Sequence, residues 1–159
     1  MRLIPNTGSD RVIDALRAPG SPTPLTVDLA TPELSVFAFD ELRPLLSSAV
    51  GARLLLPGTE SHDLAFLGSD DDRHNRNRLT SRAIARNLAK WLTERAEIRR
   101  VKGALPQSYL GVAAESDVGT SIITGSVPFT TSGLGLTPGN THALIQAATE
   151  PAERAMYGA

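Results

Sequence analysis

The chain has 159 residues, of which 41% are hydrophobic and 21% charged, as is typical of one globular domain with its own core. Its formal net charge is −1, so binding to nucleic acid or to a membrane would need a local patch of charge. Because the chain has no cysteine, disulfides, thiolate zinc sites and cysteine nucleophiles are excluded.

The first part of the chain predicts a short helix, a strand, a longer helix and a second strand. A turn-rich segment precedes the short predicted helix over residues 11–17, which a loop with three prolines ends. The β-prone residues 25–30 predict the first central strand. Proline at a first helical position then opens a predicted helix over residues 31–47. The apolar run 52–56, closed by proline and glycine, predicts a buried strand.

The rest of the chain predicts one long helix followed by strands. After a long loop, a helix is predicted over 75–96, and its apolar face consists of Leu79, Ala83, Leu88, Trp91 and Leu92. Strands are then predicted over 97–102, 107–112, 120–124 and 141–148. A last helix is predicted from residue 149. Strands that alternate with helices indicate an α/β fold, and the close pairing near 107–124 predicts a mixed sheet. We expect one domain over residues 1–159, with helices on both faces of the sheet. Because the last helix stops abruptly, we also expect the parent protein to continue.

The segment 122–136 carries a specific resemblance. A predicted strand ends in Gly125-Ser126, and Thr130 and Ser132-Gly133-Leu134 follow. Together with the order of the elements, this segment resembles the phospholipase-D-like family over about residues 25–150. The motif of that family is His-x-Lys, four further residues and Asp, then a later strand that ends in Gly-Gly or Gly-Ser, one residue and Asn. The resemblance implies a phospholipase-D-like fold.

The same resemblance implies that the phosphodiesterase chemistry is lost. In the family the histidine attacks phosphorus, and the lysine and asparagine hold the phosphoryl oxygens. The matching positions here are occupied by Pro106, Ser108, Ala113 and Pro128. No shift of register restores the nucleophile, because no histidine lies between Arg95 and Thr141. We therefore expect a catalytically degenerate domain that holds no metal and no cofactor.

Residues 105–108 and 128–140 are similar to the degenerate module at the N-terminus of some bacterial helicase-like proteins of the SNF2 or DEAD-box type. The resemblance implies an accessory role in DNA processing, with nucleic-acid binding, homodimerisation or docking to helicase domains. The chain has no Gly-x4-Gly-Lys-Ser/Thr loop, so it cannot itself be the ATPase. The alternative is a divergent nuclease or phosphodiesterase with an unrecognised active site.

A basic stripe marks the long predicted helix. Arg78, Arg82, Arg86 and Lys90 follow one another at intervals of four residues, and Arg73 and Arg76 extend the stripe. Such a stripe can follow a phosphate backbone, with an affinity that falls steeply with salt. The alternative is a solvated helix face.

The hydroxyl-rich turn after residue 124 is a candidate vestigial anion site, formed by Gly125, Ser126, Thr130 and Ser132. The alternative is that the hydroxyls satisfy the backbone of the turn itself. The acidic residues 70–72 are adjacent and lack the spacing of a calcium loop, so they indicate a surface loop. The three histidines, at positions 62, 74 and 142, have no partner at ligand spacing.

The N-terminal residues lack the apolar run of a signal peptide, and no window of the sequence is long and apolar enough to span a bilayer. We expect a cytoplasmic protein with no membrane partner.

Overall fold

Two β-α-β units organise one side of the sheet. In the computed structural model, which describes residues 1–17, 24–58, 80–114 and 120–157, strand β2 (Leu25–Ala30) pairs in parallel with β3 (Ala49–Pro57), and β3 pairs in parallel with β4 (Ala96–Val101). Helix α2 (Val36–Ser47) follows β2 in the chain, and α4 (Ser81–Arg95) precedes β4. The sequence predicted these elements in this order.

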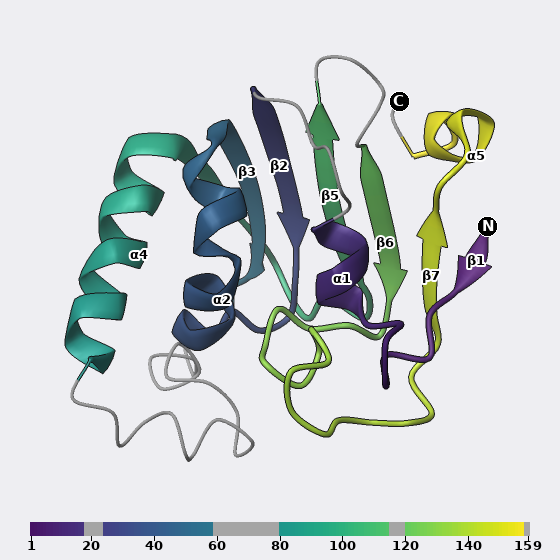
Figure 1. Ribbon diagram of the computed structural model, residues 1–159. Coiled ribbons are helices and arrows are strands. Elements are labelled where there is room, and N and C mark those ends of the chain that lie inside the picture. Colours follow the sequence, from purple (N-terminus) through teal and green to yellow (C-terminus); the bar gives the residue numbers. More distant parts are fainter. Residues whose placement is uncertain (18–23, 59–79, 115–119, 158–159) are drawn as a thin grey trace.

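Antiparallel strands complete the sheet on the other side of β2. The remaining strands are β1 (Arg2–Leu3), β5 (Ser108–Ala114), β6 (Ser121–Gly125) and β7 (Ile145–Ala148). β5 pairs antiparallel with β2, and β6, β7 and β1 follow it in antiparallel pairs. The strand order is β1-β7-β6-β5-β2-β3-β4 (Figure 1). The mixed sheet predicted from the sequence is confirmed.

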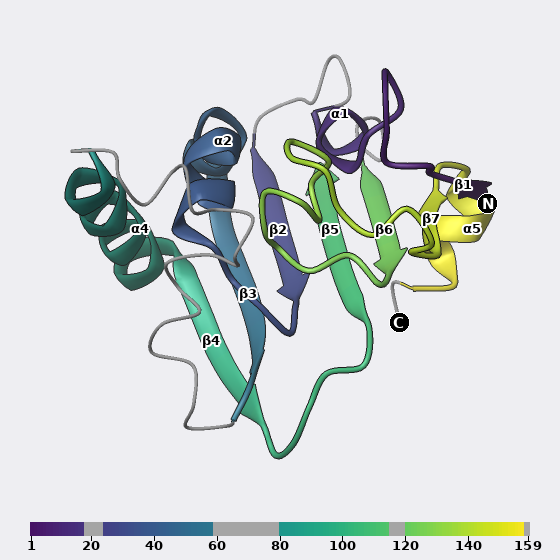
Figure 2. The same cartoon turned by 90° about the horizontal axis from the view of Figure 1, so that it is seen from below.

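One face of the sheet is covered by helices. Figure 2 shows α1 (Val12–Leu16), α2 and α4 on the same side of the strands. In β2, Leu25, Val27 and Leu29 are buried on this side, whereas Thr26 is exposed and Asp28 is half-buried on the other. The last helix, α5 (Pro151–Ala155), follows β7 and buries none of its residues.

The expectation of helices on both faces is not met at β2 and β3, whose second face carries none of the described helices, but toward β6 and β7 that face is also closed over, because Ile122 and Ala148 are buried there. The physical reason is the alternation along the central strands. The run 52–56 reads as a buried strand in the sequence, yet Arg53 of β3 is exposed, and its ion-pair partner Asp28 of β2 is half-buried on the face away from α2 and α4. A charged pair on that face of β2 and β3 needs no helix over it.

One helix boundary and one helix face differ from the sequence-based expectation. α2 starts at Val36, because the Ser35 hydroxyl accepts hydrogen bonds from the N–H groups of Phe37 and Ala38. On α4, Ala83 is exposed and Ile84 is buried in its place. α4 packs on α2 through Trp91, whose ring centroid lies 5.6 Å from that of Phe39.

Two glycines of the segment 122–136, which resembles the phospholipase-D-like family and is called the family-like segment below, are required by the backbone. Gly125, at the end of β6, has φ +130°, and a Cβ there would overlap the carbonyl oxygen of Leu144. A Cβ on Gly133 would overlap the carbonyl oxygen of Pro128. The folding of this loop alone therefore explains why these glycines are present.

The substitution Gly125→Ala is expected to destabilise the protein by at least about 2 kcal/mol, because alanine is strained at this φ and its Cβ meets backbone that cannot move aside. Urea unfolding of the two proteins measures the difference. Gly51→Ala is the control, since φ is not positive there and nothing lies within 4 Å of the added Cβ. Equal effects of the two substitutions would contradict this account.

Candidate functional site

The two halves of the family-like motif lie at the same end of the sheet. β5 and β6 are antiparallel neighbours, and Ser108 at the start of β5 pairs with Gly125 at the end of β6. Pro106 and Pro128 flank this pair in the sequence. Ala113 lies farther along β5, opposite Thr26. The structure thus brings the compared segments together.

None of the four motif positions carries a group for phosphodiester chemistry. Proline and alanine side chains offer neither a nucleophile nor a hydrogen-bond donor. The Ser108 side chain is 3% exposed, and its Oγ has no hydrogen-bond partner among the described residues. It is buried without a base beside it that could activate the hydroxyl.

The hydroxyl-rich turn is held together by its own side chains. Thr130 Oγ1 accepts a hydrogen bond from the Gly133 N–H at 3.1 Å and lies 3.2 Å from the Ser132 hydroxyl. The Asn6 amide donates to the Gly133 carbonyl at 3.0 Å, and its oxygen accepts from the Val12 N–H at 3.0 Å. These bonds favour the turn-forming role of the hydroxyls.

A hollow of about 400 Å³ lies against this turn and includes Ser126, Thr130 and Ser132 in its lining. Glu33 is the one charged residue among the lining side chains described. A carboxylate repels an anion, and a bound phosphate would find no cation here to offset that repulsion. The electrostatics of the hollow therefore oppose its use as an anion site.

The basic stripe lies on the outer face of α4. Arg82, Arg86 and Lys90 are exposed, whereas Ile84 and Leu88 on the opposite side of the helix are buried. Lys90 Nζ lies 3.8 Å from Glu94, an exposed pair of little net energy. The other predicted members, at positions 73, 76 and 78, fall outside the described residues.

A groove between α2 and α4 adds basic residues that the sequence analysis missed. The groove has a volume of about 200 Å³ and its lining includes Arg43 from α2, with Lys90, Glu94 and Arg95 from α4. Three cations and one carboxylate line it, and Asp40, outside the lining, lies 3.6 Å from Arg43, so the balance of these charges is positive by one. Arg43 follows no basic pattern along α2, so its proximity to Lys90 could not be read from the sequence.

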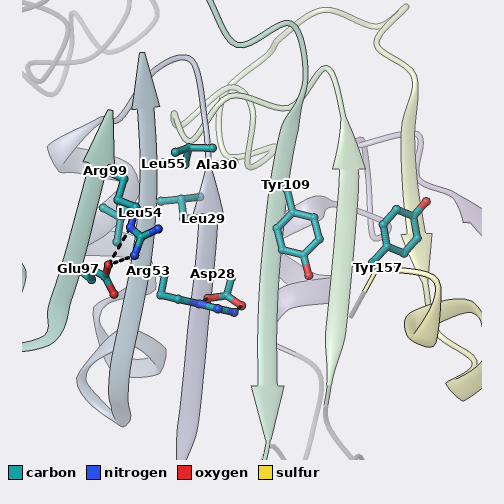
Figure 3. Close-up of a pocket in the computed structure, with 10 residues that line it drawn as sticks. All are labelled: Asp28, Leu29, Ala30, Arg53, Leu54, Leu55, Glu97, Arg99, Tyr109 and Tyr157. Atoms are coloured by element: carbon teal, nitrogen blue, oxygen red, sulfur yellow. Dashed lines mark hydrogen bonds and ion pairs between the residues drawn. The ribbon is translucent and has the colours of Figure 1, made fainter. Parts of the chain in front are cut away.

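The open face of the sheet carries a second cluster (Figure 3). Arg53 donates two hydrogen bonds to the Asp28 carboxylate, at 2.6 and 2.5 Å. A hollow of about 370 Å³ extends from this pair over β4 and β5 to Tyr109 and Tyr157, whose ring centroids are 6.4 Å apart. The chain has only these two tyrosines, and the structure brings both to one hollow. Burial, and then the negative charge of Asp28, raise the pKa of Tyr109, while Arg53 opposes the rise.

The remaining candidates give no site. His142 is exposed, and the other two histidines and the acidic residues 70–72 lie outside the described residues. The parts of the chain that the structure describes contain no group of three or more His, Cys, Asp or Glu side chains that could hold a metal ion. In those same parts, no helix has the length and apolarity needed to cross a membrane.

The comparisons with known proteins assign no relative. No protein-family model matches the chain, and no curated protein is significantly similar to it. The function must therefore be argued from the residues themselves.

Burial and the neighbouring Asp28 carboxylate lead us to expect a raised pKa for Tyr109. In a Tyr157→Phe background, Tyr109 is the only phenol left, and we expect its pKa to lie above the ordinary value of about 10. Adding Asp28→Asn should lower that pKa, because a negative charge is removed and Arg53 is left without its partner. Phenolate absorbance measured against pH gives both values.

The raised pKa of Tyr109 also makes the folding stability of the protein depend on pH. A raised pKa in the folded state favours the neutral phenol, so its contribution to stability is complete below the ordinary pKa of tyrosine. That contribution is lost as the pH rises through the raised pKa. Asp14→Asn, which removes a carboxylate on α1, is the control for the titration and should leave the Tyr109 curve unchanged. A curve that Asp28→Asn does not move would contradict the assignment.

Proposed function

We propose that this domain is a catalytically degenerate phospholipase-D-like module that binds nucleic acid through the outer face of α4 and the adjoining groove. The observation that carries the proposal is the run of exposed cations Arg82, Arg86 and Lys90 beside a groove that adds Arg43 and Arg95. Successive phosphates along a backbone fit a row of exposed cations. Like charges four residues apart also destabilise a helix slightly, a cost that a binding role explains.

The phospholipase-D-like part of the proposal is supported by two features. The order β2, α2, β3, α4, β4, β5, β6 is the order on which the resemblance was based. Ser108 and Gly125, which stand at the lysine position and at the glycine of the second motif, are direct neighbours across β5 and β6. Because the four motif positions hold no nucleophile, no base and no cation, the proposed role is binding without cleavage.

The wider setting of the proposal comes from the resemblance alone. It is an accessory role in a bacterial, cytoplasmic, helicase-like DNA-processing protein, in which this module contributes binding and a separate part supplies ATP hydrolysis. The module would hold DNA near the motor or dock onto the helicase domains. The absence of a phosphate-binding loop from this chain is consistent with that division of labour.

Fluorescence anisotropy with labelled single- and double-stranded DNA tests the binding surface. The triple variant Arg82→Ala, Arg86→Ala, Lys90→Ala is expected to bind at least about tenfold more weakly at low salt. Its plot of log affinity against log salt should also be flatter on duplex DNA, by about 0.9 for each phosphate that the variant no longer neutralises.

The matched control removes three cations elsewhere, through Arg2→Ala, Lys102→Ala and Arg154→Ala. Both triple variants change the net charge equally, so weaker binding by the α4 variant alone locates the surface on that helix. Equal weakening would mean that only the overall charge matters, and no binding by the unmodified protein would contradict the proposal.

The same samples, run on a gel with and without magnesium, test the absence of catalysis. We expect the DNA to remain intact under both conditions. Cleavage that His142→Ala abolishes would instead establish the divergent nuclease as the function, because His142 is the one histidine in the described part of the chain.

A further inference from the structure

β4 forms one edge of the sheet. It stands last in the strand order, and among the residues that the structure describes it pairs with β3 alone. All six of its residues are exposed or half-buried. A strand of this length at an edge presents a row of backbone groups on which a further strand can form. The side chains of β4 determine which strand fits.

One contact between β4 and β3 shows which N–H and C=O groups of β4 point away from the sheet. The carbonyl oxygen of Val101 lies 2.6 Å from the place that a Cβ would occupy on Gly58, at the end of β3. The backbone of Val101 therefore faces β3. Since successive residues of a strand point their N–H and C=O groups to opposite sides, those of Ala96, Ile98 and Arg100 face away from β3.

The side chains of the edge are self-complementary in charge. Glu97 and Arg99 line the hollow on the open face and form an ion pair, with Arg99 Nη2 2.7 Å from a Glu97 oxygen (Figure 3). Ile98 pairs in register with the buried Leu54 and lies on the helix-bearing face, yet it is 45% exposed. The edge thus combines an acid and a base on one face with an uncovered isoleucine on the other.

We propose that β4 pairs antiparallel with β4 of a second copy of this chain, with Ile98 opposite the partner's Ile98. Glu97 of each copy then faces the partner's Arg99, and Ala96 faces the partner's Arg100. The outward backbone groups of Ala96, Ile98 and Arg100 become the hydrogen-bonded positions of the new ladder. The two-fold axis runs perpendicular to the sheet, so the two sheets join edge to edge and their open faces stay on one side.

Charge selects this register over its neighbours. The nearest other antiparallel registers that keep the outward backbone groups paired and each side chain on its own face are shifted by two residues in either direction. One such shift places Glu97 opposite the partner's Glu97, and the other places Arg99 opposite the partner's Arg99. Like charges directly opposite one another destabilise an antiparallel pair, whereas opposite charges stabilise it. Only the proposed register has two complementary pairs.

The dimer brings both α4 helices to the same face of the joined sheet, because α1, α2 and α4 all lie on one face of each copy (Figure 2). It leaves free the end of β5 and β6 where Ser108 and Gly125 are paired. The interface does not depend on DNA binding, and its test requires no DNA.

Sedimentation velocity of the full chain across a concentration series tests the interface. The unmodified protein is expected to dimerise. Glu97→Arg and Arg99→Glu should each weaken the dimer at least about tenfold, because each places like charges opposite one another. Mixing the two variants in equal amounts should restore a dimer, since every acid in the mixed pair then faces a base. The double variant Glu97→Arg, Arg99→Glu should dimerise like the unmodified protein.

Arg100→Glu is the matched control, because it reverses a charge on the same strand but on the other face, opposite the partner's Ala96. It should leave the dimer within about threefold of the unmodified protein. Recovery of the dimer in the mixture excludes misfolding of the single variants as the cause of their weaker association. A monomer at every concentration, a dimer that ignores both reversals, or a mixture that stays monomeric would overturn the proposal.

Discussion

The structure depends on the burial of one face of its central strands, β2 and β3. β2 is the strand from which this arrangement follows, because it bonds to β3 on one side and to β5 on the other. Its buried side chains, Leu25, Val27 and Leu29, lie beneath the helices, and its alternate residues remain on the open face. Every surface of functional interest is defined by this division, since the helix-bearing face carries the basic groove and the open face carries the charged pairs.

The segment 122–136 owes several of its residues to folding alone. Gly125 and Gly133 are fixed by backbone geometry, Thr130 binds the turn from within, and Asn6 binds it from the N-terminal segment. These residues would be retained by folding whether or not a phosphodiester were ever cleaved. The positions where the resemblance would place catalytic side chains hold Pro106, Ser108 and Pro128. The glycines therefore need no functional explanation, and the proposal of a binding role without cleavage depends on those other positions.

The two proposed surfaces address different parts of the molecule. The groove beside α4 is a positively charged concavity between two helices, suited to a polyanion. The β4 edge is nearly balanced in charge and offers backbone hydrogen bonds, suited to another strand. A dimer built on that edge presents two copies of the groove on one side, which would allow two contacts with one nucleic-acid molecule.

The sequence by itself determined the order of the elements from α1 onward, though not β1, together with the mixed sheet and the exposure of Arg82, Arg86 and Lys90, because periodicity and turn residues act locally along the chain. It could not determine that one face of β2 and β3 carries none of the described helices, since an apolar run such as residues 54–56 reads the same whether one face or both are covered. Nor could it place Arg43 beside Lys90, or Tyr157 near Tyr109. Those proximities join residues far apart in the chain, and only the packing of helices on the sheet and the order of its strands decide them.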